Sequence, residues 1–165
     1  MHDFQHNYTR ELAFSSILIA FFSVLRVVLY PLLGGNPTFV LIILIASFLS
    51  RRIALFSGIG FYIVTGLFLG FGIWVLFQIL AIAIIVVISS RLPKQKIYFC
   101  IFGVVSAFIY SFVMLFSALP YMSLDAIPAY IVVGLPNDFA RAATNFLYMI
   151  ALYRDSFISL LTKYK

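Results

Sequence analysis

Six side chains in this sequence stand within or beside long apolar runs and have the chemistry to hold a polar ligand. Arginine can meet an anion, glutamine and asparagine can hydrogen-bond amides, and an indole combines apolar area with an N–H donor. A charge in the middle of a membrane helix costs about 2.5–3.5 kcal/mol, so such residues usually serve a function. The candidates for substrate binding are Arg26, Trp74, Gln78, Asp138, Arg141 and Asn145.

Two of these candidates follow a glycine-rich break. Gly70 and Gly72 interrupt an apolar run, and Trp74 and Gln78 come next, one helical turn apart, so we expect them to share a helix face. Such a face can hold a polar ligand in an apolar bundle. The alternative is a tight turn, an interfacial tryptophan anchor and one hydrogen bond between helices.

Three more candidates share a face near the start of the last apolar run. Asp138, Arg141 and Asn145 follow the i, i+3, i+7 spacing of one helix face. The alternative is a structural ion pair between Asp138 and Arg141, with Arg26 extending its charge to the membrane surface. Arg26 stands in the second half of the first apolar run. All six candidates are therefore expected at a similar depth, which predicts a pocket open to the outside.

Residues for catalysis or metal binding are scarce. The histidines are His2 and His6, no cluster of His, Cys and carboxylates suits a metal ion, and no phosphate-binding Gly-x-x-x-x-Gly-Lys-Ser/Thr loop is present. We therefore expect no metal, no intrinsic cofactor and no enzymatic activity. Transport against a gradient would need energy from a partner or an ion.

The composition is typical of a membrane protein that crosses the bilayer several times. The chain is 64% hydrophobic and only 10% charged, whereas soluble domains carry about 25% charged residues. Continuous apolar runs predict helices rather than alternating strands. We expect one domain, 1–165, that is an all-α integral membrane protein of six transmembrane helices, at 11–33, 38–50, 53–69, 73–90, 97–119 and 137–161.

The basic residues predict how such a bundle is oriented. With both termini in the cytoplasm, nine of the eleven Lys and Arg residues fall in inner segments and none in outer loops. The remaining two, Arg26 and Arg141, lie within helices. The net charge of +6 is thus expected to meet anionic lipid of the bilayer rather than nucleic acid. The predicted location is the bacterial cytoplasmic membrane.

The first helix carries a spacing that suits contact with another helix. Ser16 and Ala20 form a small-xxx-small motif in its inner half, which lets helices approach closely. We take them as partner-coupling residues. The alternative is that they pack within this bundle.

Three stretches of the sequence resemble the substrate-binding S-components of energy-coupling factor (ECF) vitamin transporters. Ser16 to Ala20 resembles the Ala-x-x-x-Ala coupling motif of the first helix in that family. Gly70-x-Gly72-x-Trp74-x-x-x-Gln78 resembles a Gly-x-Gly-Pro-Trp-Thr-x-x-Gln signature of its cobalamin-type subgroup, with Ile73 and Val75 as departures. Residues 134–145 resemble the opening of the last helix in the same subgroup.

The resemblance implies a vitamin-binding subunit of six helices, most similar to those that take cobalamin. It implies capture of the vitamin from outside and docking on the transmembrane coupling protein EcfT, with ATP hydrolysed by two partner ATPase subunits. Two alternatives stay open. One is an S-component for another small vitamin, of pyridoxine, pyrimidine or pantothenate type. The other is a membrane scaffold or assembly protein without a small-molecule ligand.

Overall fold

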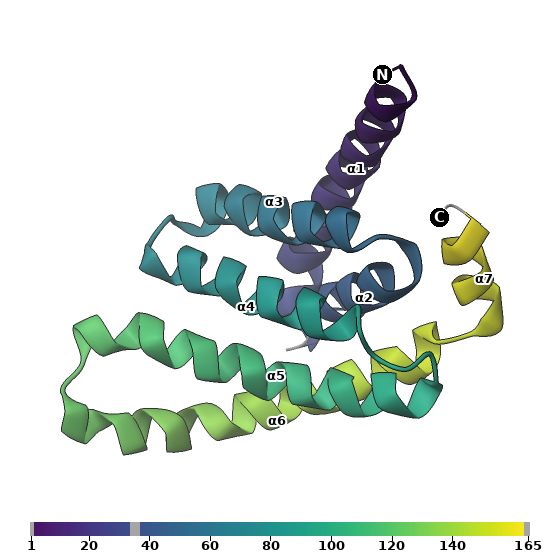
Figure 1. Cartoon of the computed structure of the whole chain (residues 1–165). Helices are drawn as coiled ribbons and strands as arrows, with labels where there is room; N and C mark the ends of the chain where they lie inside the picture. The colour runs from purple at the N-terminus through teal and green to yellow at the C-terminus, as the bar shows by residue number, and fades with distance from the viewer. Residues whose placement is uncertain (1, 34–36, 164–165) are drawn as a thin grey trace.

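The computed structural model describes residues 2–33 and 37–163, and the side-chain surroundings of 9–29 and 37–163. The described residues form helices and no strand, which confirms the predicted all-α class. Figure 1 shows α3 to α6 side by side, with the N-terminal half of α1 projecting from the bundle. The elements are α1 (His2–Leu33), α2 (Thr38–Leu44), the π-helix η1 (Ile45–Leu49), α3 (Arg51–Leu69), α4 (Ile73–Ser89), α5 (Lys96–Ala118), the short 3-10 helices η2 (Leu119–Tyr121) and η3 (Leu124–Ala126), α6 (Ile127–Leu152) and α7 (Asp155–Lys163).

The middle of the chain follows the predicted helix bounds closely. The predicted helices 53–69, 73–90 and 97–119 agree with α3, α4 and α5 to within two residues at each end, and 38–50 corresponds to α2 with η1. The predicted start at residue 11 is wrong, because α1 begins at His2. Residues 2–10 contain no glycine or proline to stop a helix. The helix also continues through Pro31 to Leu33, and residues 34–36 of the predicted break lie outside the described residues.

The predicted last helix, 137–161, is wrong at both ends. α6 begins at Ile127, within a segment that the sequence suggested was a loop. Pro128 stands in its first turn, where the missing N–H of proline costs no helical hydrogen bond. Pro136 lies inside the helix. At the other end the chain breaks at Tyr153 and Arg154, and α7 follows as a separate amphipathic helix.

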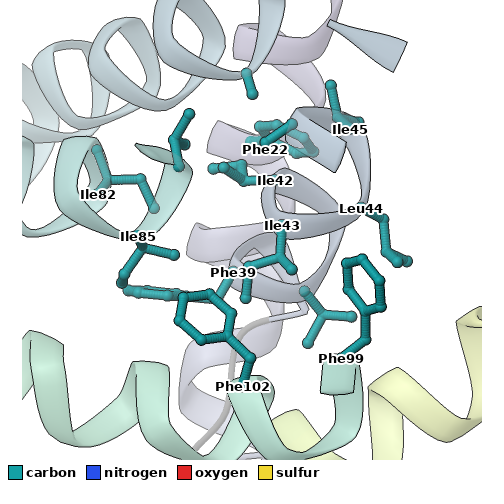
Figure 2. Close-up of a cluster of buried hydrophobic side chains, with 14 of the residues drawn as sticks. Phe22, Phe39, Ile42, Ile43, Leu44, Ile45, Ile82, Ile85, Phe99 and Phe102 are labelled. Carbon is teal, nitrogen blue, oxygen red and sulfur yellow. The ribbon is translucent and has the colours of Figure 1, made fainter. Parts of the chain in front are cut away.

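The core of the bundle is built around α2 and η1. All residues of these two elements except Leu41 are buried, and α2 contacts each of α1, α3, α4, α5 and α6. A helix that is apolar on every side is stable only when it is enclosed. Figure 2 shows the surrounding side chains from α2, α4 and α5 that meet there: Phe39, Ile42, Ile43, Ile82, Ile85, Phe99 and Phe102.

The helix directions follow from the contacts between them. α1 and α3 run in the same direction, since Phe22 packs on Phe61 while Arg26 bonds to Thr65 one turn further along both helices. The α2–η1 segment between them turns the chain back through the core. From α3 onward, α3, α4, α5 and α6 follow one another as antiparallel hairpins (Figure 1).

The hairpins give the bundle two different ends. The turns at 70–72 and 119–126 lie at one end, which we call the glycine end (Figure 1). The junctions at 50–52, 91–96 and 153–154 lie at the other, which we call the basic end. Folding thus gathers cations that are far apart in sequence: Arg51, Arg52, Arg91, Lys94, Lys96 and Arg154.

Three helices in the described part of the chain are long and apolar enough to cross a membrane, at Thr9–Leu29, Arg51–Leu69 and Lys96–Tyr121. The segments Thr38–Leu49 and Ile73–Ser89 are apolar but shorter. With 7 residues in α2 and 5 in η1, the buried segment reaches at most about 18 Å, whereas a hydrocarbon core is about 30 Å thick. Six crossings therefore remain a prediction.

Candidate functional site

A buried hydrogen bond joins α4 to α5 in the half of the bundle nearer the glycine end. Gln78 Nε2 donates to the hydroxyl of Tyr110 at 2.9 Å, and both residues are at most 9% exposed. Phe39 of α2 packs edge-on against the Tyr110 ring, with centroids 5.1 Å apart. Because a buried amide without a partner is costly, this bond fixes the register of the two helices.

Arg26 turns towards α3, where its partners are aromatic. Its guanidinium carbon lies 4.9 Å from the centroid of the Tyr62 ring and 5.5 Å from that of Phe61. Its Nη1 donates to Thr65 Oγ1 at 3.3 Å. Within the described residues, no carboxylate pairs with Arg26. Ring faces stabilise this cation without neutralising its charge.

The two tyrosines connect Arg26 to the far side of the bundle. Tyr62 is 2% exposed, and its hydroxyl interacts with that of Tyr110. Arg141 in turn lies over Tyr110, with its guanidinium carbon 4.8 Å from the ring centroid. A continuous chain of contacts therefore runs from α1 through α3 and α5 to α6.

Arg141 also belongs to a small polar group between α5 and α6. Its Nη1 lies 3.8 Å from Asp138 Oδ1 and donates to Ser111 Oγ at 3.4 Å. The hydroxyl of Ser111 donates to the same oxygen of Asp138. The ion pair of Asp138 and Arg141, which the sequence offered as the alternative to a binding site, is thus present at 3.8 Å, and Ser111 hydrogen-bonds to both partners.

These contacts define one group, which we call the tyrosine cluster. It contains four of the predicted site residues, Arg26, Gln78, Asp138 and Arg141, together with Tyr62, Thr65, Tyr110 and Ser111. The sequence did not single out the last four. Each of the four carries a hydroxyl within an apolar run, which is the signal that could have found them. In a chain with 19 Phe and 10 Tyr, however, that signal does not separate a functional tyrosine from one that packs in the core.

Trp74 lies outside the tyrosine cluster. Its side chain is 43% exposed, and its ring folds back over the glycine turn, where a Cβ at Gly72 would collide with it. Gly70 has φ 103°, a left-handed conformation that favours glycine. Although Trp74 and Gln78 are one turn apart on α4, their surroundings differ, because the indole lies against the turn and the amide against Tyr110.

Asn145 lies one turn beyond Arg141 and ties α6 to α5. Its Nδ2 donates to the Gly103 carbonyl at 3.1 Å and lies 3.4 Å from Ser106 Oγ. Asn145 is fully buried, and its Oδ1 is the one buried side-chain atom without a partner among the described residues. Asn145 therefore joins helices, and its free oxygen can accept one more hydrogen bond.

The predicted coupling residues face outward. Ser16 and Ala20 are exposed on α1, whereas Ser15 and Phe22 on the other face are buried. The hydroxyl of Ser16 donates to the Leu12 carbonyl, so its hydrogen bond is made within its own helix. Among the described residues, Ser16 and Ala20 are therefore exposed rather than packed in the bundle.

Among the described residues, no three His, Cys, Asp or Glu side chains come close enough to hold a metal ion. The cluster is instead a set of donors and cations suited to binding a polar or anionic group. Comparison with family models, curated proteins and solved structures gives no match. A function for this chain is therefore inferred from the tyrosine cluster.

Proposed function

We propose that this chain is the substrate-binding membrane subunit of an energy-coupling factor vitamin importer, with cobalamin as its solute. The observation that carries the proposal is the tyrosine cluster. Polar and charged side chains from α1, α3, α4, α5 and α6 meet there inside a bundle whose other contacts are mostly apolar. Embedded ionisable groups are expensive, and in membrane proteins they mark solute pathways more often than packing.

The position of the cluster fits capture from outside. Thr65 stands in the last two turns of α3 and Gln78 in the first two turns of α4, so the cluster lies nearer the glycine end. In the proposed topology the basic end faces the cytoplasm and the glycine end faces outward. A solute would then reach the cluster from the side opposite the ATPase subunits.

The exposed face of α1 fits a partner of the kind that the proposal requires. Ser16 and Ala20 present small side chains outward. In the most apolar 18-residue stretch of this helix, only 11% of the residues are buried within the chain. A second transmembrane helix can approach such a face closely. In the proposal this is the surface that docks on the coupling protein, whose two ATPase subunits supply the energy.

The proposal is tested by vitamin uptake in cells that lack their own importers. Cobalamin, pyridoxine, pantothenate and a pyrimidine-type vitamin would be supplied with and without the coupling protein and ATPases. We expect saturable uptake of cobalamin that needs the whole module, and binding of cobalamin to the isolated chain. Absence of saturable binding for every vitamin would contradict the proposal and favour a scaffold protein.

Variants separate the role of the exposed α1 face from that of the tyrosine cluster. Ser16→Leu and Ala20→Leu should reduce uptake at least tenfold while binding to the isolated chain persists, because they enlarge the docking face. Ala151→Leu, at an exposed alanine of α6, is the matched control. Gln78→Leu should weaken binding itself, with Gln95→Leu at the exposed basic end as its control. Parallel loss of binding and uptake in Ala20→Leu would mean that this face serves the fold.

A further inference from the structure

Arg26 and Arg141 come from the first and last long helices, yet both act on one pair of tyrosines. Arg26 lies over Tyr62 and Arg141 over Tyr110, at 4.9 and 4.8 Å from the ring centroids. The Tyr62 hydroxyl is in hydrogen-bond contact with Tyr110. One pair of neighbouring tyrosines thus carries a guanidinium group on each of its two rings.

The charges of the tyrosine cluster do not balance. Asp138 is the one carboxylate in it, and it pairs with Arg141. Arg26 has no carboxylate partner in the described part of the chain, so the cluster carries one positive charge in excess. Cations embedded in membrane proteins are usually paired, because an isolated charge in an apolar environment is costly. The excess charge is therefore available to a ligand.

Arg26 also has hydrogen-bond donors to spare. A guanidinium carries five N–H donors, and the structure gives one of them to Thr65. Arg26 is half-buried, so its side chain is not enclosed in the core. On the neighbouring ring, the Tyr110 oxygen accepts a hydrogen bond from Gln78. The oxygens of a carboxylate or a phosphate match the donors of a guanidinium.

We propose that Arg26 and Arg141, held apart by Tyr62 and Tyr110, bind a carboxylate or phosphate group of the solute. This inference rests on the proposed function, since it places the solute in the tyrosine cluster. Asp138 has a definite part in it. It occupies Arg141 when no solute is bound and competes with the incoming anion for the same guanidinium.

Two sources can supply an oxyanion at this depth, a dissolved solute or the headgroup of a phospholipid. The experiment uses the purified full-length chain in a neutral detergent, with the thermal midpoint as readout. One arm adds inorganic phosphate against chloride at equal ionic strength. The other adds phosphatidylglycerol against phosphatidylcholine. Stabilisation by phosphate supports the solute, whereas Arg26-dependent stabilisation by phosphatidylglycerol alone assigns the anion site to lipid and overturns the solute assignment.

Replacing Arg26 and replacing Asp138 should change the affinity for phosphate in opposite directions. Arg26→Gln should weaken phosphate binding roughly tenfold to a hundredfold, the value of a hydrogen-bonded charge. Arg10→Gln, an exposed arginine on the same helix, removes the same charge and should leave the effect in place. Asp138→Asn should strengthen phosphate binding, because it removes the competing carboxylate, and a misfolded variant cannot produce that gain.

Three results would overturn the anion site, two of them in the phosphate experiment. One is stabilisation by phosphate no greater than by chloride in the parent chain. The other is an equal response of Arg26→Gln and Arg10→Gln. A vitamin that binds with unchanged affinity to Arg26→Gln would contradict the anion site and leave the proposed function in place. Arg26-dependent phosphate binding with no saturable vitamin binding would contradict the proposed function and leave the anion site in place.

Discussion

The amide nitrogen of Gln78 donates to the hydroxyl of Tyr110 across 2.9 Å, and this buried bond connects α4 to the tyrosine pair on which both arginines lie. Tyr110 accepts from Gln78, supports Arg141 on its ring face and interacts with Tyr62. One side chain thus couples α4, α5, α6 and α3. Its loss should affect stability and the cluster together.

Tyr110→Phe should lower the free energy of unfolding by about 1–3 kcal/mol, because the amide of Gln78 would be left buried without an acceptor. The double variant Gln78→Leu with Tyr110→Phe should be more stable than the sum of the single variants predicts, since no polar group then remains unpaired. Thermal midpoints of the purified chain measure both effects. Strictly additive losses would mean that the two side chains do not depend on each other.

The single tryptophan of the chain reports directly on the glycine turn. Gly72→Ala should move the Trp74 ring off the turn, because the added Cβ would collide with it. The exposed ring is free to swing away, so the change should appear in tryptophan fluorescence with little loss of stability. Gly134→Ala is the control, since its nearest contact is an ordinary 3.9 Å to Asp138 Oδ2. Identical emission spectra for both variants would contradict the placement of the indole.

The two ends of the bundle should lie on opposite sides of the membrane. In a Cys100→Ala background, a cysteine at Ser123 near the glycine end should react with an impermeant maleimide added to intact cells. A cysteine at Gln95 in the basic end should react only after the membrane is opened. Both positions are exposed in the structure, so access to the reagent depends on sidedness. Labelling of Gln95 from outside would reverse the proposed orientation.

Tyr153, at the break between α6 and α7, gives a pH dependence. Burial raises the pKa of its hydroxyl, and the negative charges of the Asp155 carboxylate and of the ionised Cys100 thiol raise that pKa further. The folded chain therefore holds this proton more tightly than the unfolded chain, whose tyrosine has a pKa of about 10. The stabilisation is complete below that pH and is lost as pH rises through the higher folded pKa.

The hydrogen bond from Tyr153 to the Lys94 carbonyl, at 3.0 Å, should be lost over the same range. Thermal midpoints measured from neutral pH to above pH 10 should fall more steeply for the parent than for Tyr153→Phe. Tyr121→Phe, which removes an exposed hydroxyl near the glycine end, is the control. Equal slopes for the parent and Tyr153→Phe would rule out this linkage.

The sequence by itself determined the properties that depend on local runs of residues. Continuous apolar stretches between turn residues set the positions of α3, α4 and α5, and the placement of lysine and arginine predicted which turns would gather at one end. Hydropathy and charge are properties of single residues along the chain, so neither signal depends on which residues become neighbours in space. They failed at α6, where Pro128 begins a helix instead of ending one.

The tertiary structure decided which partner each polar side chain received. Arg26 bonds to Thr65 and lies on Tyr62 because α1 and α3 run in the same direction, a consequence of the short buried α2–η1 segment. Nothing in the spacing of Arg26 along the chain distinguishes that outcome from a surface charge. Hydrophobic burial depends on composition, whereas a hydrogen bond or ion pair depends on two groups meeting within a few ångströms, and only packing brings those groups together.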